Sequence, residues 1–150
     1  MGHYQTRIAF HEIDYGRVIF HGAVHGIVQK ALEELYLDAG IDLRQLFREQ
    51  RIGIPIVESR CVFVAPLLYL DLVEVRCGIA DLTPKGYRML FNLYVLPDER
   101  LAVAGHLRHR FVDTRQFRGV EASEEVLAAF RRLEPGEPLV DSVTAYRYDD

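Results

Sequence analysis

Asp14 is the residue whose type and position in this sequence best suit chemistry. It stands between a short stretch that alternates like a strand and a glycine-containing passage that leads into a helix. A carboxylate at such a place can act as a nucleophile or as a general base. On position alone the plainer interpretation is favoured, because an aspartate at the start of a loop commonly bonds its own backbone. The residues alone leave both roles of Asp14 open.

Two pairs of histidines indicate metal binding only weakly. His21 and His25 are four residues apart, so they share one face of a helix, but Gly22 stands where the zinc-protease motif has its glutamate. His106 and His109 are three apart on a strand-like run and therefore point to opposite faces. The sequence also contains neither a Walker loop nor a dinucleotide fingerprint. We therefore expect no metal and no cofactor.

Hydrophobic periodicity indicates the elements that would position these side chains. Residues 4–10 alternate as a short strand, and apolar residues at three- and four-residue steps predict a helix that begins near His21 and ends before Gly40. Asp42 can cap a second, short helix. The gaps between the later strands are short and carry turn residues, which favours antiparallel neighbours in a four-strand meander. These strands and a last helix, which Ser123 can cap, span residues 57–64, 72–80, 87–96, 101–112 and 123–133.

The order of these elements predicts an α+β fold. One strand, one long helix and four further strands imply a helix laid across a five-stranded antiparallel sheet. A single sheet on one helix leaves edges and faces open, so self-association is expected. The 150 residues fit one domain. Residues 134–150, which begin with Pro135, Gly136 and Pro138 close together, are expected to form a loosely ordered C-terminal tail.

Composition argues against several classes of function. The formal net charge of -4, without a basic run, argues against binding to nucleic acid or to a membrane surface. No stretch reaches the roughly 18 apolar residues of a membrane helix, and no apolar core of a secretory signal is present. A cytoplasmic location is therefore expected. Cys61 and Cys77 should be reduced thiols, with a disulfide between neighbouring strands as the minor alternative.

The stretch FHEIDYGRVIFHGAVHG resembles the hotdog-fold thioesterases of the 4-hydroxybenzoyl-CoA thioesterase type. The likeness covers about residues 4–113 and implies a central helix wrapped by the sheet. The sequence departs from the family pattern at Arg17, where glycine is frequent, and at His25, where tyrosine is frequent. The matching features are a strand that ends in an aspartate, a glycine-containing loop, a hydrophobic-hydrophobic-aromatic step and the central helix: Asp14, Gly16, Val18, Ile19, Phe20 and the helix from His21.

The resemblance implies hydrolysis of an acyl-CoA thioester to a free acid and CoA. A thiolate leaves easily, so one carboxylate and one helix N-terminus that stabilises the oxyanion can suffice. By resemblance, Asp14 is the nucleophile or general base and the backbone N–H of His21 binds the carbonyl oxygen, while the His21 imidazole can orient water. The residues implied to contact the substrate are Tyr15, Gly16, Val18, Phe20, His25 and Glu58.

Two groups of charged residues on the strands have two interpretations each. Glu58 and Arg60 share one face and form either a pocket or interface pair or a solvated pair at a sheet edge. Arg108 and Arg110 are in phase with His106. They either bind the phosphates of CoA or belong to an outward polar face.

Two further functions are compatible with the sequence. The chain could release an acyl or polyketide chain from an acyl carrier protein, or it could be a non-catalytic acyl-CoA-binding module. In each case the partner is an acyl thioester. The resemblance also implies a homodimer or homotetramer in which two protomers join their sheets edge to edge and form active sites at the interface.

Overall fold

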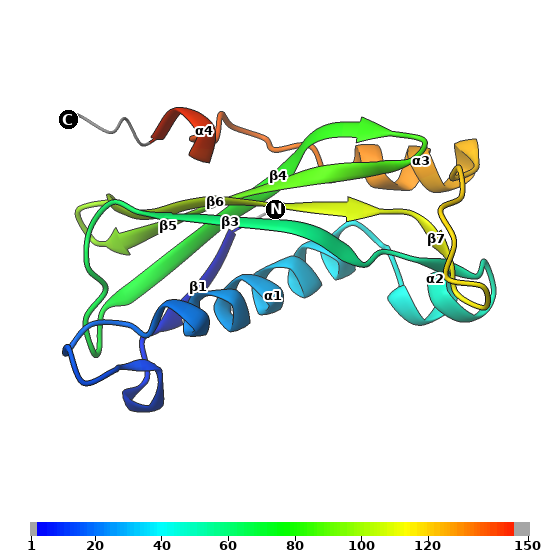
Figure 1. The fold of residues 1–150 in the computed structure, drawn as a ribbon. Helices are drawn as coiled ribbons and strands as arrows, with labels where there is room; N and C mark the ends of the chain where they lie inside the picture. The colour runs from blue at the N-terminus through cyan, green and yellow to red at the C-terminus, as the bar shows by residue number, and fades with distance from the viewer. Residues whose placement is uncertain (1–2, 146–150) are drawn as a thin grey trace.

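The protein is built around one antiparallel sheet with a long helix against one face (Figure 1). The computed structural model describes residues 3–145. The strands lie in the order β1, β4, β5, β6, β3, and each neighbouring pair is antiparallel. The predicted α+β fold with a five-stranded antiparallel sheet is confirmed. The strands span β1 His3–Arg7, β3 Ile56–Phe63, β4 Leu72–Thr83, β5 Gly86–Leu96 and β6 Arg100–Arg110.

Helix α1, His21–Asp38, supplies one side of the core. Gly40 follows it with φ of 75°, a left-handed conformation that glycine adopts without steric cost, and this turn ends the helix as predicted. The buried side chains of α1 recur at three- and four-residue steps and share one core with inward side chains of the sheet, such as Val75 and Phe91. These helix positions are Val24, Ile27, Val28, Ala31, Leu32, Leu35 and Tyr36.

The position of β3 corrects one expectation. β3 pairs with β6, not with β4, so only β4, β5 and β6 form a meander. The available edge of β4 is taken by β1, and the segment after β3 crosses to that side, where Leu70 N–H donates to Ile8 O and Ile8 N–H donates to Asp71 O. β3 is therefore an edge strand, and it carries the exposed apolar side chains Ile56, Val57 and Phe63.

Two short helices and a small sheet lie beyond the C-terminal end of α1 (Figure 1). Asp42 caps the first helix by accepting hydrogen bonds from the N–H groups of Arg44 and Gln45, and Ser123 caps the second by accepting one from Val126. Both caps agree with the sequence prediction. The bounds are α2 Leu43–Arg48, α3 Glu124–Arg131, β2 Ile52–Gly53 and β7 Val112–Asp113.

A polar group lies inside the aromatic core near this end. The hydroxyls of Tyr36 and Tyr87 are 2.7 Å apart, and the Tyr87 ring stacks on His109 with ring centroids 4.5 Å apart. The His109 Nδ1 donates to the carbonyl of Ile54 at 2.8 Å, because a carbonyl oxygen can only accept. Burial lowers the pKa of His109 below its ordinary value of 6.5. His109 is therefore a neutral core residue, and it lies on the opposite face of β6 from His106.

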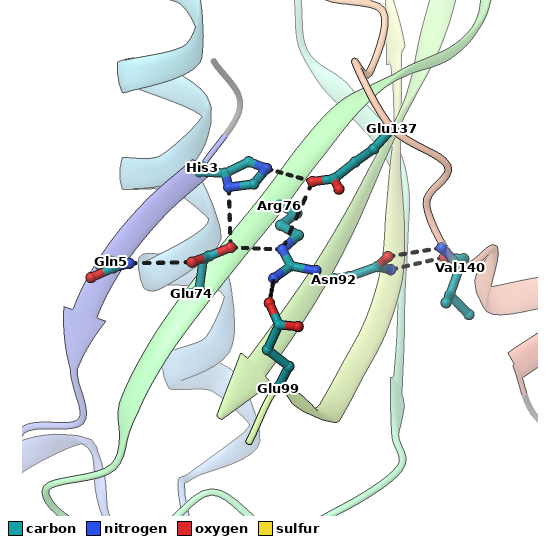
Figure 2. A network of polar contacts seen from close by, with 8 residues as sticks. All are labelled: His3, Gln5, Glu74, Arg76, Asn92, Glu99, Glu137 and Val140. Carbon is teal, nitrogen blue, oxygen red and sulfur yellow. Dashed lines mark hydrogen bonds and ion pairs between the residues drawn. The ribbon is translucent and has the colours of Figure 1, made fainter. Parts of the chain in front are cut away.

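The other face of the sheet is crossed by residues 135–145, which we call the C-terminal strap and which ends in α4, Ser142–Ala145 (Figure 1). Figure 2 shows the Asn92 side chain bonded to both the N–H and the carbonyl of Val140, each at 2.8 Å, and Glu137 bonded to His3 at 2.6 Å. The strap thus makes specific polar contacts with the sheet. The last five residues of the tail expected from the sequence, 146–150, lie outside the described residues.

The two cysteines lie on strands that are far apart in the sheet. Cys61 is on β3 and Cys77 on β4, with β5 and β6 between them. Three strand spacings of about 4.8 Å separate them by roughly 14 Å. A disulfide needs Cα atoms within about 7 Å, so the alternative of a disulfide is wrong.

Candidate active site

A cleft of about 350 Å³ opens beside the first turn of α1. It lies between the loop that precedes α1 and the chain around the end of β3. Three of the predicted site residues, Asp14, Val18 and His21, line it. The sequence prediction missed the remaining lining residues, which are mostly apolar: Ile19, Phe63, Val64, Ala65, Pro66 and Leu67. The cleft therefore combines a carboxylate, an imidazole and an apolar wall.

The loop before α1 fixes the Asp14 carboxylate. The N–H of Asp14 donates to Val18 O, and the N–H of Arg17 donates to Asp14 O, both at 3.0 Å. The N–H of Gly16 donates to Asp14 Oδ1 at 2.7 Å. Asp14 thus bonds its own loop, as the plainer interpretation expected, and still lines the cleft. The two interpretations are compatible, because one carboxylate oxygen serves the turn while the group remains exposed.

Arg17 and Gly16 explain the departure of this loop from the family pattern. Arg17 has φ of 66°, the left-handed conformation that glycine adopts freely and that costs another residue roughly 1–2 kcal/mol. It occupies the place at which the resembling family often has glycine, the residue that adopts this conformation without steric cost. Gly16 has a separate role, because a Cβ there would lie 3.0 Å from Asp14 Oδ1.

The start of α1 is anchored by its neighbours and not by a side-chain cap. Ile19 N–H donates to Leu67 O at 2.9 Å, and Phe20 N–H donates to Glu12 O at 2.8 Å, where Glu12 ends the short 3-10 helix η1, Phe10–Glu12. Within the described residues, the N–H groups of His21 and Gly22 have no recorded acceptor. A helix start carries a partial positive charge. Because His21 lines the cleft, this charge lies at the same cleft as Asp14.

The other residues implied to contact substrate lie outside the lining of this cleft. Tyr15 is fully exposed, and His25 is exposed one turn further along α1. Phe20 is about half exposed and packs against the imidazole of His21. Gly16 acts through its N–H on Asp14. A single chain therefore brings Asp14, Val18 and His21 to the cleft. It does not bring the other implied substrate contacts of this loop and helix there.

Glu58 lies on the face of the sheet that the strap covers. Its Oε1 is 2.6 Å from His106 Nε2, and His106 Nδ1 is 2.8 Å from Ser142 Oγ. The hydrogen bond from His106 lowers the pKa of Glu58. Glu58 is thus committed to the contact between sheet and strap, away from the cleft of Asp14. Arg108 and Arg110 are exposed toward the far end of β6 from the cleft.

A larger hollow of about 470 Å³ lies at the opposite end of α1, between α1 and α2. It contains none of the predicted site residues. Its one aspartate, Asp42, is occupied in capping α2 and in pairing with Arg44. Size alone would favour this hollow, but chemistry favours the smaller cleft, which is lined by both the Asp14 carboxylate and the first residue of helix α1.

Two other kinds of feature are absent from residues 3–145. These residues contain no group of three or more histidine, cysteine or carboxylate residues that could hold a metal ion. They also contain no helix that is long and apolar enough to cross a membrane.

Comparison with known proteins places the chain among thioesterases. Residues 8–130 match the family described as the thioesterase-like superfamily. Over 138 residues the chain is 23% identical to a 1,4-dihydroxy-2-naphthoyl-CoA hydrolase of Rippkaea orientalis, covering 91% of this chain and 100% of the relative. A protein of the same name from Thermosynechococcus vestitus is 27% identical over 101 residues, covering 67% of this chain and 69% of the relative.

Solved structures agree on the fold. A gentisyl-coenzyme A thioesterase superposes with a TM-score of 0.74 at 26% identity, over 85% of this chain and 98% of that one. A 1,4-dihydroxy-2-naphthoyl-CoA thioesterase from Synechocystis superposes with a TM-score of 0.78 at 13% identity, over 86% and 94% of the two chains. The predicted hotdog fold is confirmed.

Proposed function

This chain belongs to the thioesterase-like superfamily, and on that premise we propose that it hydrolyses an acyl-CoA thioester to a free acid and CoA, with Asp14 as the catalytic carboxylate. The observation that supports this most is that Asp14 and the first turn of α1 line one cleft. The relatives named as CoA thioester hydrolases support the same reaction class.

The proposed mechanism needs few groups. Asp14 either attacks the thioester carbonyl or removes a proton from an attacking water. The backbone N–H of His21 and the positive end of α1 stabilise the oxyanion of the tetrahedral intermediate. That intermediate collapses by breaking the carbon–sulfur bond and releases CoA as a thiolate. In the nucleophilic route, water then cleaves the mixed anhydride formed on Asp14.

The substrate contacts follow from the cleft. Val18, Phe63 and Val64 offer the apolar wall for the acyl group. Gly16 contributes by orienting the carboxylate. Tyr15, His25 and Glu58 remain predicted contacts, and a joined second copy would be needed to bring them to substrate. We further propose that the chain forms a single domain, that it assembles as a cytoplasmic homodimer or homotetramer, and that it needs no cofactor.

Asp14 variants test the proposal. We predict that Asp14→Asn and Asp14→Ala each lower kcat at least about 100-fold, because the attacking carboxylate or base is lost. Release of free thiol from acyl-CoA measures turnover, and circular dichroism verifies the fold. Asp113→Asn is the matched control, since Asp113 also accepts backbone N–H bonds within a turn but lies at β7. Near wild-type turnover in both Asp14 variants would remove Asp14 from the mechanism.

Single turnover in ¹⁸O-labelled water separates the two roles of Asp14. If Asp14 is the nucleophile and water opens the mixed anhydride at the Asp14 carbonyl carbon, the label appears in the peptide that contains this residue and the released acid carries an oxygen from Asp14. Label in the released acid alone fits either a general base or an anhydride opened at the acyl carbon, and hydroxylamine separates these two, because it traps an acyl–Asp14 anhydride only in the nucleophilic route. Mass spectrometry of both species distinguishes the two results.

The acyl group and its carrier form the finer part of the proposal. The relatives' names favour a panel with 1,4-dihydroxy-2-naphthoyl-CoA, and the resemblance seen in the sequence adds 4-hydroxybenzoyl-CoA. The same acyl group on CoA and on an acyl carrier protein tests the carrier-protein alternative. Saturable acyl-CoA binding without thiol release would instead indicate a non-catalytic binding module.

A further inference from the structure

Phe20, the residue directly before α1, packs tightly against the first turn of the helix. Its ring centroid lies 4.6 Å from that of the His21 imidazole, with the rings tilted by 52°. A Cβ placed on Gly22 would lie 2.6 Å from Phe20 Cε1 and 3.3 Å from Cδ1 and Cζ. Carbon atoms do not approach to 2.6 Å without displacement, so the ring occupies a notch that exists only because residue 22 is glycine.

The His21 imidazole depends on this contact for its orientation. Within residues 3–145 the imidazole makes no recorded hydrogen bond or ion pair, although it lines the cleft with Asp14. An exposed side chain with no such bond can exchange between rotamers. A neighbouring aromatic ring favours one of them, because tilted ring pairs attract beyond their buried area.

We propose that Phe20 is a positioning residue, whose ring, seated in the Gly22 notch, holds the His21 imidazole at the cleft that it shares with Asp14. This inference rests on the proposed thioesterase function. Phe20 itself does not line the cleft, so it acts through His21 and not by contact with substrate. It follows that Gly22 keeps the notch open for the ring.

A double-mutant cycle tests the coupling. Phe20→Ala should lower kcat about 3- to 10-fold with little change in KM, because the imidazole loses its preferred orientation while substrate binding remains. In a His21→Ala background, Phe20→Ala should have no further effect, since its target is already absent. Phe20→Tyr keeps the ring contact and should restore kcat. Single-turnover measurements allow the rate of the chemical step to be determined even for variants with very low kcat.

Two further variants separate positioning from general damage. Gly22→Ala should reproduce the loss of kcat although the phenyl ring remains, because the new methyl group displaces it, and urea unfolding should show no matching loss of stability. Phe10→Ala is the matched control: Phe10 lies in the same loop, is 77% exposed and packs on Tyr69 instead of His21. It should leave kcat unchanged.

The NMR signals of the His21 ring protons test the contact without any turnover. The Phe20 ring current should shift them, and Phe20→Leu should abolish that shift. Unshifted signals in the wild type, an equal effect of Phe20→Ala in both backgrounds, or full activity of Gly22→Ala would each overturn the proposal. Full activity of Asp14→Asn would instead overturn the proposed function and leave the NMR result standing.

Discussion

At the scale of single residues, Arg17 offers a simple test of how the loop holds Asp14. The left-handed backbone of Arg17 destabilises the folded state by roughly 1–2 kcal/mol. Glycine would remove this steric cost, but its greater conformational entropy in the unfolded chain would offset roughly 0.5–1 kcal/mol of the gain. We therefore predict that Arg17→Gly raises the free energy of unfolding by about 0.5 kcal/mol and preserves activity. Urea unfolding measures it. Arg17→Ala, which keeps a Cβ, should bring no gain, and equal effects of the two variants would contradict the strain argument.

His109 predicts how stability depends on pH. Burial lowers its pKa in the folded protein, so between that lowered value and 6.5 the unfolded chain binds more protons than the folded one. The free energy of unfolding should therefore fall as pH falls below about 6.5 and recover as pH rises.

Unfolding measured from pH 5 to 7.5 tests this, with His109→Phe as the comparison. Phenylalanine can keep the stack on Tyr87 but cannot titrate, so the variant should show a flatter profile even if it is less stable overall. Glu58 does not account for this pH dependence, because its pKa is lowered from 4.5 in the folded protein. Its contribution to the free energy of unfolding is therefore lost mainly at pH values below the measured range. Identical slopes for the two proteins would contradict the prediction.

At the scale of elements, β3 is an edge strand with apolar side chains exposed. If two copies join at this edge, a charge on it should separate them. We predict that Val57→Lys, at a residue that is 57% exposed, shifts the protein toward monomer in light scattering coupled to size-exclusion chromatography. Val143→Lys is the matched control, because Val143 is 59% exposed but lies on α4. Equal behaviour of both variants would place the interface elsewhere.

Local sequence signals predicted most elements and part of the site. The apolar steps of α1, the turn at Gly40 and the caps at Asp42 and Ser123 are encoded within a few residues, and each appears in the structure. The edge position of β3 is not encoded locally, because it depends on the pairing of β1 with the edge of β4, two segments that lie far apart in the sequence. For the same reason Phe63 and its neighbours were missed as a cleft wall. They approach Asp14 only once the chain has crossed the sheet.

At the scale of the whole molecule, the C-terminal strap joins the chain to the outer face of the sheet. Asn92 is fully buried and satisfies both backbone groups of Val140. Asn92→Ala should leave these groups without partners and lower the free energy of unfolding by about 1–3 kcal/mol. Gln5→Ala, which removes a weaker contact to Glu74 on the same face, should cost much less. Urea unfolding measures the stability of both variants. An equal loss of unfolding free energy in the two would show that the contact of Asn92 with the strap does not stabilise the protein.

The close approach of Phe20 to Gly22 constrains how this protein can diversify. A larger side chain at position 22 is admissible only if the ring at position 20 shrinks or swings away, so position 22 is not free to change alone. Mutational libraries should vary the two codons jointly, because single-site scanning will record position 22 as intolerant and overlook compensated pairs. Descendants that have abandoned glycine at position 22 should accordingly have either lost the aromatic ring at position 20 or turned it away from the helix.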